Sequence, residues 1–98
     1  MHPPLKCNPG DIVTEYLGES MAAKYIIIGR EFHRDYRDTE FICYVSVILY
    51  VCGDWAEFHK PGTLWNIDSQ PITSAIRYEV TFRSPLTWEA NPLQTPRR

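Results

Sequence analysis

The chain has 98 residues, of which 44% are hydrophobic and 13% aromatic. This is enough for one domain with a buried core, and the composition differs from that of disordered chains. The formal net charge is −2, from 10 basic and 12 acidic residues, which disfavours nucleic-acid binding because phosphate recognition usually needs a basic excess. An odd number of cysteines and the lack of an apolar leader favour a reducing, cytoplasmic location, and no apolar run is long enough to cross a bilayer.

The first half of the chain predicts an arm followed by two strands. Residues 1–9 contain three prolines and predict an extended N-terminal arm, which ends at a Pro-Gly-Asp turn. β-branched and aromatic residues then predict strands over 12–17 and 25–32, separated by small and polar residues. Gly29 lies inside the second strand and indicates a bulge. Charged residues over 33–40 predict a solvated hairpin tip.

The third strand, over 41–52, alternates between an apolar and a mixed set of residues. Its odd positions are all apolar and predict the core face: Phe41, Cys43, Val45, Val47, Leu49 and Val51. Its even positions include polar groups and predict an outer face: Ile42, Tyr44, Ser46, Ile48, Tyr50 and Cys52.

The last part of the chain predicts two more strands and a tail. Residues 55–60 fit a short irregular or helical segment, and 63–67 a short strand. Residues 76–82 alternate between apolar and polar without error and predict a strand with all four apolar side chains inward. The tail, 84–98, contains three prolines and is expected to run over the surface or stay mobile. We therefore expect one mainly β domain over 10–83, a small antiparallel barrel or rolled sheet of about five strands.

The stretch Pro9-Gly10-Asp11-Ile12-Val13, a variable loop, and then Tyr25-Ile26-Ile27-Ile28-Gly29-Arg30 resembles the first hairpin of SH3-like small β-barrels. Accessory domains of bacteria and phages carry this pattern, and the resemblance covers roughly positions 9–32. It implies a non-enzymatic binding module, because such barrels mostly dock proteins or nucleic acids. The short single-domain chain is also similar to accessory proteins that phages encode. No functional residue is carried over.

Catalytic and metal-binding signals are weak. The chain has no CxxC, no HxxxH and no close Cys/His pair, so the usual zinc spacing is missing. His33, Asp35 and His59 could share an ion only if the fold brought them together. A hydrolase would need Cys52, Asp54 and His59 to meet, and nothing in their spacing forces this. We therefore expect no metal, no cofactor and no enzymatic activity.

A surplus of hydrophobic side chains points to a protein partner, with a homodimer as one form of it, because exposed apolar patches usually mark interfaces. The predicted anchors lie on the outer face of the third strand and outside the clean strand faces: Tyr44, Ile48, Tyr50, Trp55 and Trp65. In the alternative, the tail folds back and Leu86 and Trp88 cover this patch.

The second functional hypothesis is nucleic-acid binding through a local cluster around the hairpin tip. Its members could meet phosphate and stack on bases: Arg30, Arg34, Tyr36 and Arg37. Acidic residues interleaved with them cancel much of their positive field. The sequence therefore favours the protein partner, with the charged tip providing specificity.

Overall fold

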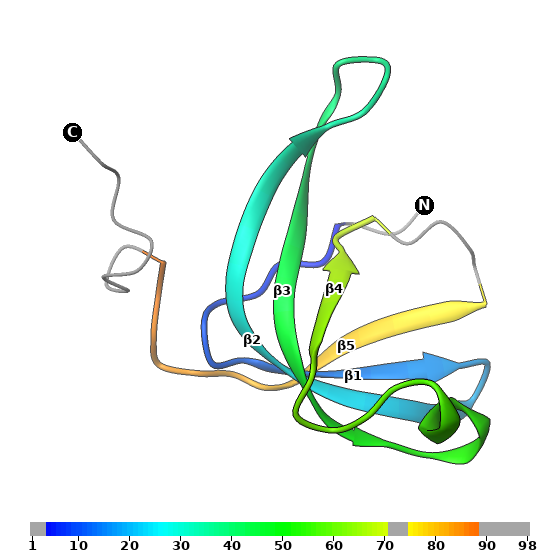
Figure 1. The fold of residues 1–98 in the computed structure, drawn as a ribbon. Coiled ribbons are helices and arrows are strands. Elements are labelled where there is room, and N and C mark those ends of the chain that lie inside the picture. Colours follow the sequence, from blue (N-terminus) through cyan, green and yellow to red (C-terminus); the bar gives the residue numbers. More distant parts are fainter. Residues whose placement is uncertain (1–3, 71–74, 89–98) are drawn as a thin grey trace.

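The computed structural model describes residues 4–70 and 75–88, and in this part of the chain it has five strands and one short 3-10 helix (Figure 1). The elements are β1 (Ile12–Leu17), β2 (Ser20–Arg34), β3 (Glu40–Val51), η1 (Gly53–Glu57), β4 (Leu64–Asp68) and β5 (Ile76–Phe82). All strand pairs are antiparallel and form one sheet in the order β4-β3-β2-β1-β5. The prediction of a mainly β, five-stranded antiparallel fold is confirmed. The sheet does not close, because β4 and β5 do not pair with each other.

The long strands β2 and β3 bend the sheet. Their pairing shifts register twice: Ile28 is an extra residue on β2, between Ile27 and Gly29, and Leu49 is an extra residue on β3, opposite the Lys24–Tyr25 step. A bulge increases the local twist and bends the strand. Figure 1 shows β2 and β3 curving so that β4 and β5 lie on two differently oriented parts of the sheet. The bulge predicted beside Gly29 is confirmed.

β2 begins at Ser20, not at Tyr25 as the sequence pattern predicts. Gly18, with φ of 64°, lies in the tight turn between β1 and β2, and a positive φ is a conformation that glycine adopts at little cost. The small residues Ala22 and Ala23, whose segment fits a loop or a single helical turn by sequence, are buried strand residues.

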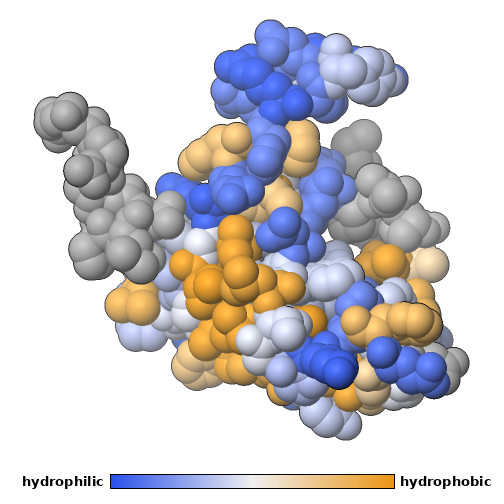
Figure 2. All heavy atoms as spheres, in the orientation of Figure 1, coloured by the Kyte–Doolittle hydropathy of each residue, from blue (hydrophilic) through white to orange (hydrophobic). Residues whose placement is uncertain are grey.

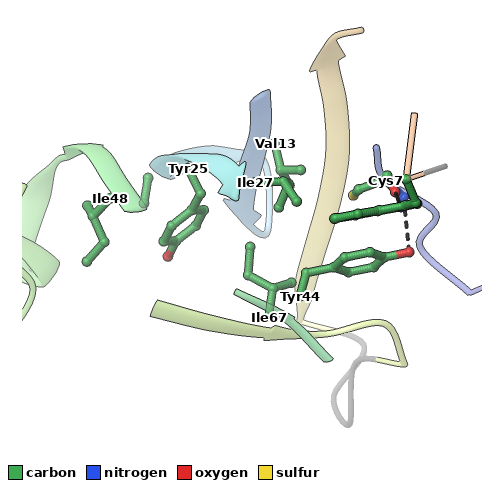
Figure 3. Packing of buried hydrophobic residues seen from close by; sticks show 9 residues of the cluster. Cys7, Val13, Tyr25, Ile27, Tyr44, Ile48 and Ile67 are labelled. Atoms are coloured by element: carbon green, nitrogen blue, oxygen red, sulfur yellow. Dashed lines mark hydrogen bonds between the residues drawn. The ribbon is translucent and has the colours of Figure 1, made fainter. Parts of the chain in front are cut away.

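The core lies on the inner, concave face of the sheet. It is formed by residues from four strands, from the N-terminal arm and from the segment after β5: Cys7, Val13, Ala23, Tyr25, Ile27, Tyr44, Ile48, Ile67 and Trp88 (Figure 3). The predicted fourfold inward packing of β5 is only partly correct. Tyr78 and Val80 pack against the core, but a register shift between Ile12 and Val13 places Phe82 opposite Ile12, where it is 54% exposed.

The predicted faces of β3 are reversed as far as Ile48. Beyond the Leu49 bulge, Val51 packs against the core as predicted. The even-numbered residues Tyr44, Ser46 and Ile48 are buried in the core, so the assignment of Val45 and Val47 to the core face is wrong. Burying these polar atoms costs little because each has a partner. The Ser46 hydroxyl donates to the carbonyl oxygen of Trp65 at 2.7 Å, and the Tyr44 hydroxyl is bonded to the N-terminal arm.

The segment 84–88 packs on the domain. Trp88 is buried, its indole N–H donates to the carbonyl oxygen of Cys7 at 2.8 Å, and its ring stacks on Tyr44 at 6.5 Å between centroids. The alternative in which the tail folds back over Tyr44 is thus confirmed for Trp88, whereas Leu86 remains about half exposed. The rest of the predicted tail, 89–98, lies outside the described residues.

Within residues 4–70 and 75–88, no helix has the length and apolarity that a bilayer crossing needs.

Candidate protein-interaction surface

Two of the predicted anchors are core residues. Tyr44 is 2% exposed and Ile48 is 1% exposed, so neither is available for a partner of the folded chain. The Tyr44 hydroxyl accepts a hydrogen bond from the Cys7 N–H at 3.1 Å and donates one to the carbonyl oxygen of Leu5 at 3.2 Å. Its role is to hold the N-terminal arm against the sheet.

The predicted tryptophan anchors belong to a row of stacked rings on the inner face. Trp65, on β4, stacks on Tyr25 at 6.5 Å, and His59 packs between Trp65 at 4.2 Å and Trp55 at 5.0 Å. Both tryptophans are half-buried. These rings close the end of the core beside η1. Their main role is to stabilise the fold, and only part of their surface is accessible to a partner.

Trp55 also borders an apolar cleft of about 500 Å³ between η1 and the turn of the β1–β2 hairpin. Leu17, Met21 and Phe58 line it as well, and Phe58 is 77% exposed. The Cys52 thiol lies in the wall of the cleft and donates to the carbonyl oxygen of Met21 at 2.7 Å.

The basic residues of the hairpin tip are largely occupied by neighbours. Arg34 pairs with Asp38 at 3.1 Å and with Glu40 at 2.8 Å. Arg37 lies over the ring of Tyr36, which is 88% exposed. Every residue from 31 to 40 is exposed, so the predicted solvated tip is confirmed.

Arg30 does not face the solvent as the other basic residues do. Its guanidinium lies between the rings of Phe32, at 5.1 Å, and Trp88, at 4.6 Å. Its Nε is buried and has no hydrogen-bond partner within the described part of the chain. Arg30 is therefore part of the packing that holds Trp88, and it does not form one basic patch with the tip.

The largest apolar surface lies on the outer face of the sheet. Residues paired across neighbouring strands share a face, and one line of pairs crosses all five strands in the order Leu64–Val47–Ile26–Ile12–Phe82. We call these five residues the apolar row. Its end residues are the most exposed, Leu64 at 65% and Phe82 at 54%, and the three between them are half-buried.

Further apolar side chains widen this surface. Val45 lies next to Val47 on the same face of β3, and the two bulge residues Ile28 and Leu49 are 43% and 44% exposed. Figure 2 shows the resulting hydrophobic patch over the middle of β2 and β3, below the hydrophilic hairpin tip. The odd-numbered residues Val45 and Val47 of β3 are thus apolar but face outward.

A second line of pairs runs beside the apolar row in the order Tyr50–Lys24–Thr14–Glu79, and we call it the polar row. Tyr50, a predicted anchor, is 48% exposed. The Leu49 bulge places it on the outer face, opposite Lys24. Tyr50 is the one predicted anchor of β3 whose side chain is on the surface.

The residues singled out for chemistry do not form a site in the described part of the chain. His59 is held between two tryptophan rings, His33 bonds Glu31 in the exposed tip, and the side chain of Asp54 lies outside the described residues. No group of three His, Cys, Asp or Glu side chains within residues 4–70 and 75–88 could hold a metal ion.

The three cysteines are free thiols. Burial, with the neighbouring Asp11 as a smaller cause, raises the pKa of Cys7 to about 12. Burial also raises the pKa of Cys43. A raised pKa keeps a thiol protonated and unreactive near neutral pH, so neither group has the character of a catalytic nucleophile.

Sequence patterns do not predict the apolar row, because simple alternation places Val45, Val47 and Phe82 on the core side and gives Leu64 no face. The signal for it is that the odd and the even positions of β3 both carry apolar side chains, which is typical of a strand with two apolar faces. Such a strand at the middle of a sheet leaves one face for a partner.

Comparison of the chain with protein-family models, with curated proteins and with solved structures finds no match. The function has to be inferred from the surfaces of the chain itself.

Proposed function

We propose that the chain is a non-enzymatic binding module that docks another protein on the outer face of its sheet. The apolar row is the docking surface, and the polar row, which includes Tyr50, forms its border. An SH3-like relationship is part of this proposal, and the rolled antiparallel sheet, with β5 beside β1, supports it.

One observation carries the proposal: five apolar side chains in adjacent register cross the whole width of the sheet on the face opposite the core. Single exposed hydrophobic residues are common on soluble proteins, whereas contiguous apolar patches usually mark interaction sites. The cores of protein interfaces are poor in charged residues, and the apolar row contains none.

The experiment compares two surface variants in affinity capture from cells of the native host. Leu64→Glu combined with Phe82→Glu places charges at both ends of the apolar row, and Phe58→Glu is the control because Phe58 is even more exposed but lies at the cleft beside η1. We expect a partner that is retained by the wild type and by Phe58→Glu and is lost with the double variant. Equal capture by all three proteins, or loss only with Phe58→Glu, would refute docking on the apolar row.

Nucleic-acid binding by the hairpin tip has less support. The tip contains four acidic residues, Glu31, Asp35, Asp38 and Glu40, and Arg34 is already paired with two of them. Arg30 packs against Trp88, which leaves Arg37 and Tyr36 as the accessible pair. Arg37 is the one cation of this pair, and a single cation neutralises too few phosphates for strong binding.

A further inference from the structure

The apolar row and the polar row have matched positions on either side of β1, and this arrangement indicates which partner would bind there. β1 lies between β2 and β5 in the sheet, so Lys24 on β2 and Glu79 on β5 stand on either side of Thr14 in the polar row. In the apolar row, Ile26 and Phe82 stand in the same way on either side of Ile12. The face is therefore apolar in one row and of opposite charge at matched positions in the next.

We propose that a second copy of this chain covers the outer face, related to the first by a two-fold axis that runs along β1. This inference rests on the proposed function and names the partner of the same surface. The axis places β2 of one copy over β5 of the other. Ile12 then meets Ile12 of the second copy, and Ile26 meets Phe82 of the second copy.

The same operation brings opposite charges together. Lys24 lies over Glu79 of the second copy, and the pair occurs twice because an isologous interface repeats each contact. Lys24 has no ion pair with any other described residue. Glu79 already pairs with Arg77 on β5, and a carboxylate has lone pairs for a further donor.

No like charges lie directly opposite each other in this arrangement. Arg77 pairs with Tyr16 on β1, and Met21 pairs with Tyr16 from the other side. The axis along β1 therefore places Arg77 over Met21 of the second copy. An arrangement with the axis along β2 would instead place Lys24 over Lys24 of the second copy, which like-charge repulsion disfavours.

The curvature of the sheet limits the size of the interface. Because the core lies on the concave side, the outer face is convex, and only β2, β1 and β5 overlap directly. Three strands at about 4.8 Å spacing and three rows about 6.6 Å apart, through Ile12, Thr14 and Tyr16, give a footprint of roughly 300 Å² per copy, which is small compared with a standard interface. We therefore expect a weak, concentration-dependent dimer with a dissociation constant in the micromolar range or above.

Sedimentation velocity over a concentration series of roughly 1 μM to 1 mM covers this range. The wild type should pass from monomer to dimer. Lys24→Glu and Glu79→Lys should each weaken dimerisation at least about tenfold, because each variant places like charges in contact twice. In the double variant Lys24→Glu/Glu79→Lys the opposite charges meet again, so its dissociation constant should be within about threefold of that of the wild type. Arg34→Glu, a charge reversal at the hairpin tip, should leave the dimer unchanged. Circular dichroism of each variant checks that it is folded.

The outcomes separate the two proposals. A wild type that stays monomeric at every concentration, or a dimer that the charge swap does not restore, would overturn the second-copy proposal. If that result came with a captured protein that depends on Leu64 and Phe82, docking on the apolar row would stand with a different partner. If the charge swap restores the dimer and no other protein is captured, the outer face serves for self-association. A monomer that captures nothing would refute both.

Discussion

The hydroxyl of Tyr44 is the residue-level link between the sheet and the N-terminal arm. It accepts from the Cys7 N–H and donates to the Leu5 carbonyl, and the Trp88 indole N–H donates to the Cys7 carbonyl oxygen. The backbone of the arm thus finds its partners in two aromatic side chains, one from β3 and one from the segment after β5. Figure 3 shows the tyrosine ring reaching toward Cys7.

Tyr44→Phe tests how much the hydrogen bonds of the Tyr44 hydroxyl contribute to the free energy of unfolding. The variant keeps the packing of the ring but leaves the buried N–H of Cys7 without a partner, which costs about 2 kcal/mol of unfolding free energy. Urea denaturation at neutral pH measures it. Tyr50→Phe is the matched control, because Tyr50 is half exposed and its change should stay within about 0.5 kcal/mol. Equal stability of Tyr44→Phe and the wild type would show that the arm is not held by this hydroxyl.

The same residues explain why sequence patterns assigned β3 to the wrong face. Tyr44 and Ser46 carry hydroxyls, and a polar group is expected outside when its bonding partners are unknown. Those partners are the arm, Leu5 and Cys7, and the backbone of β4, which are distant in sequence. Only the folded chain brings them within reach, so alternation alone could not show that the even face is buried.

At the level of elements, strand bounds were much easier to predict than register. The ranges 12–17 and 76–82 agree with β1 and β5, because glycine and charged residues interrupt the apolar pattern there. The bulges at Ile28 and Leu49 and the shift beside Ile12 change the face of each residue that follows. Gly29 marks the bulge at Ile28, whereas nothing in the composition marks the Leu49 bulge or the shift beside Ile12. The outward position of Phe82 was therefore not predictable, and Tyr50, predicted on the outer face by simple alternation, lies there because of the Leu49 bulge.

Asp11 joins three segments and is fully buried. Its carboxylate accepts from the Asn8 N–H at 2.8 Å, from the Ser84 N–H at 2.7 Å and from Arg83 at 3.2 Å. It thereby ties the N-terminal arm and the segment after β5 to the start of β1. Together with Tyr44 and Trp88, this side chain makes residues 4–9 and 84–88 parts of the packed domain.

Asp11→Ala should therefore lower the unfolding free energy by about 3 kcal/mol or more, since two backbone N–H groups lose a charged acceptor. It should also expose Cys7, whose thiol should react with an alkylating reagent much faster than in the wild type. Glu57→Ala, an exposed acidic residue of η1, is the control and should change neither quantity. Slow Cys7 labelling in a destabilised Asp11→Ala variant would indicate that the arm is held independently of Asp11.

The molecule as a whole carries apolar side chains on both faces of its sheet. Tyr25, Tyr44 and Trp88 are buried, and Tyr78 packs against them. The sequence count of hydrophobic residues could not tell which of them fill the concave side, as Tyr44 and Ile48 do, and which stay on the convex side, as Tyr50 and Phe82 do. The core and the apolar outer surface therefore lie on opposite faces of the sheet.

Buried tyrosines also set how the whole molecule responds to alkaline pH. Burial raises the pKa of Tyr25, and its hydrogen bond to Glu15 raises it further; burial likewise raises the pKa values of Tyr78 and Tyr44. In the unfolded chain a tyrosine loses its proton near its ordinary pKa of 10.0. Above that pH the unfolded state binds fewer protons than the folded state, so stability is fully present below pH 10 and falls as the pH rises.

Urea midpoints measured from about pH 8 to about pH 11 should fall steeply above about pH 10, with Tyr25 contributing up to about 1.4 kcal/mol per pH unit. Tyr25→Phe removes one titrating group and should show a shallower fall, although it is less stable at pH 8 because Glu15 loses its buried donor. Tyr36→Phe, at the exposed tip, should follow the wild type. If Tyr25→Phe and the wild type fell with the same slope, the Tyr25 phenol would be able to ionise within the folded domain, and the packing of β1, β2 and β5 around Glu15 would have to be looser than the structure describes.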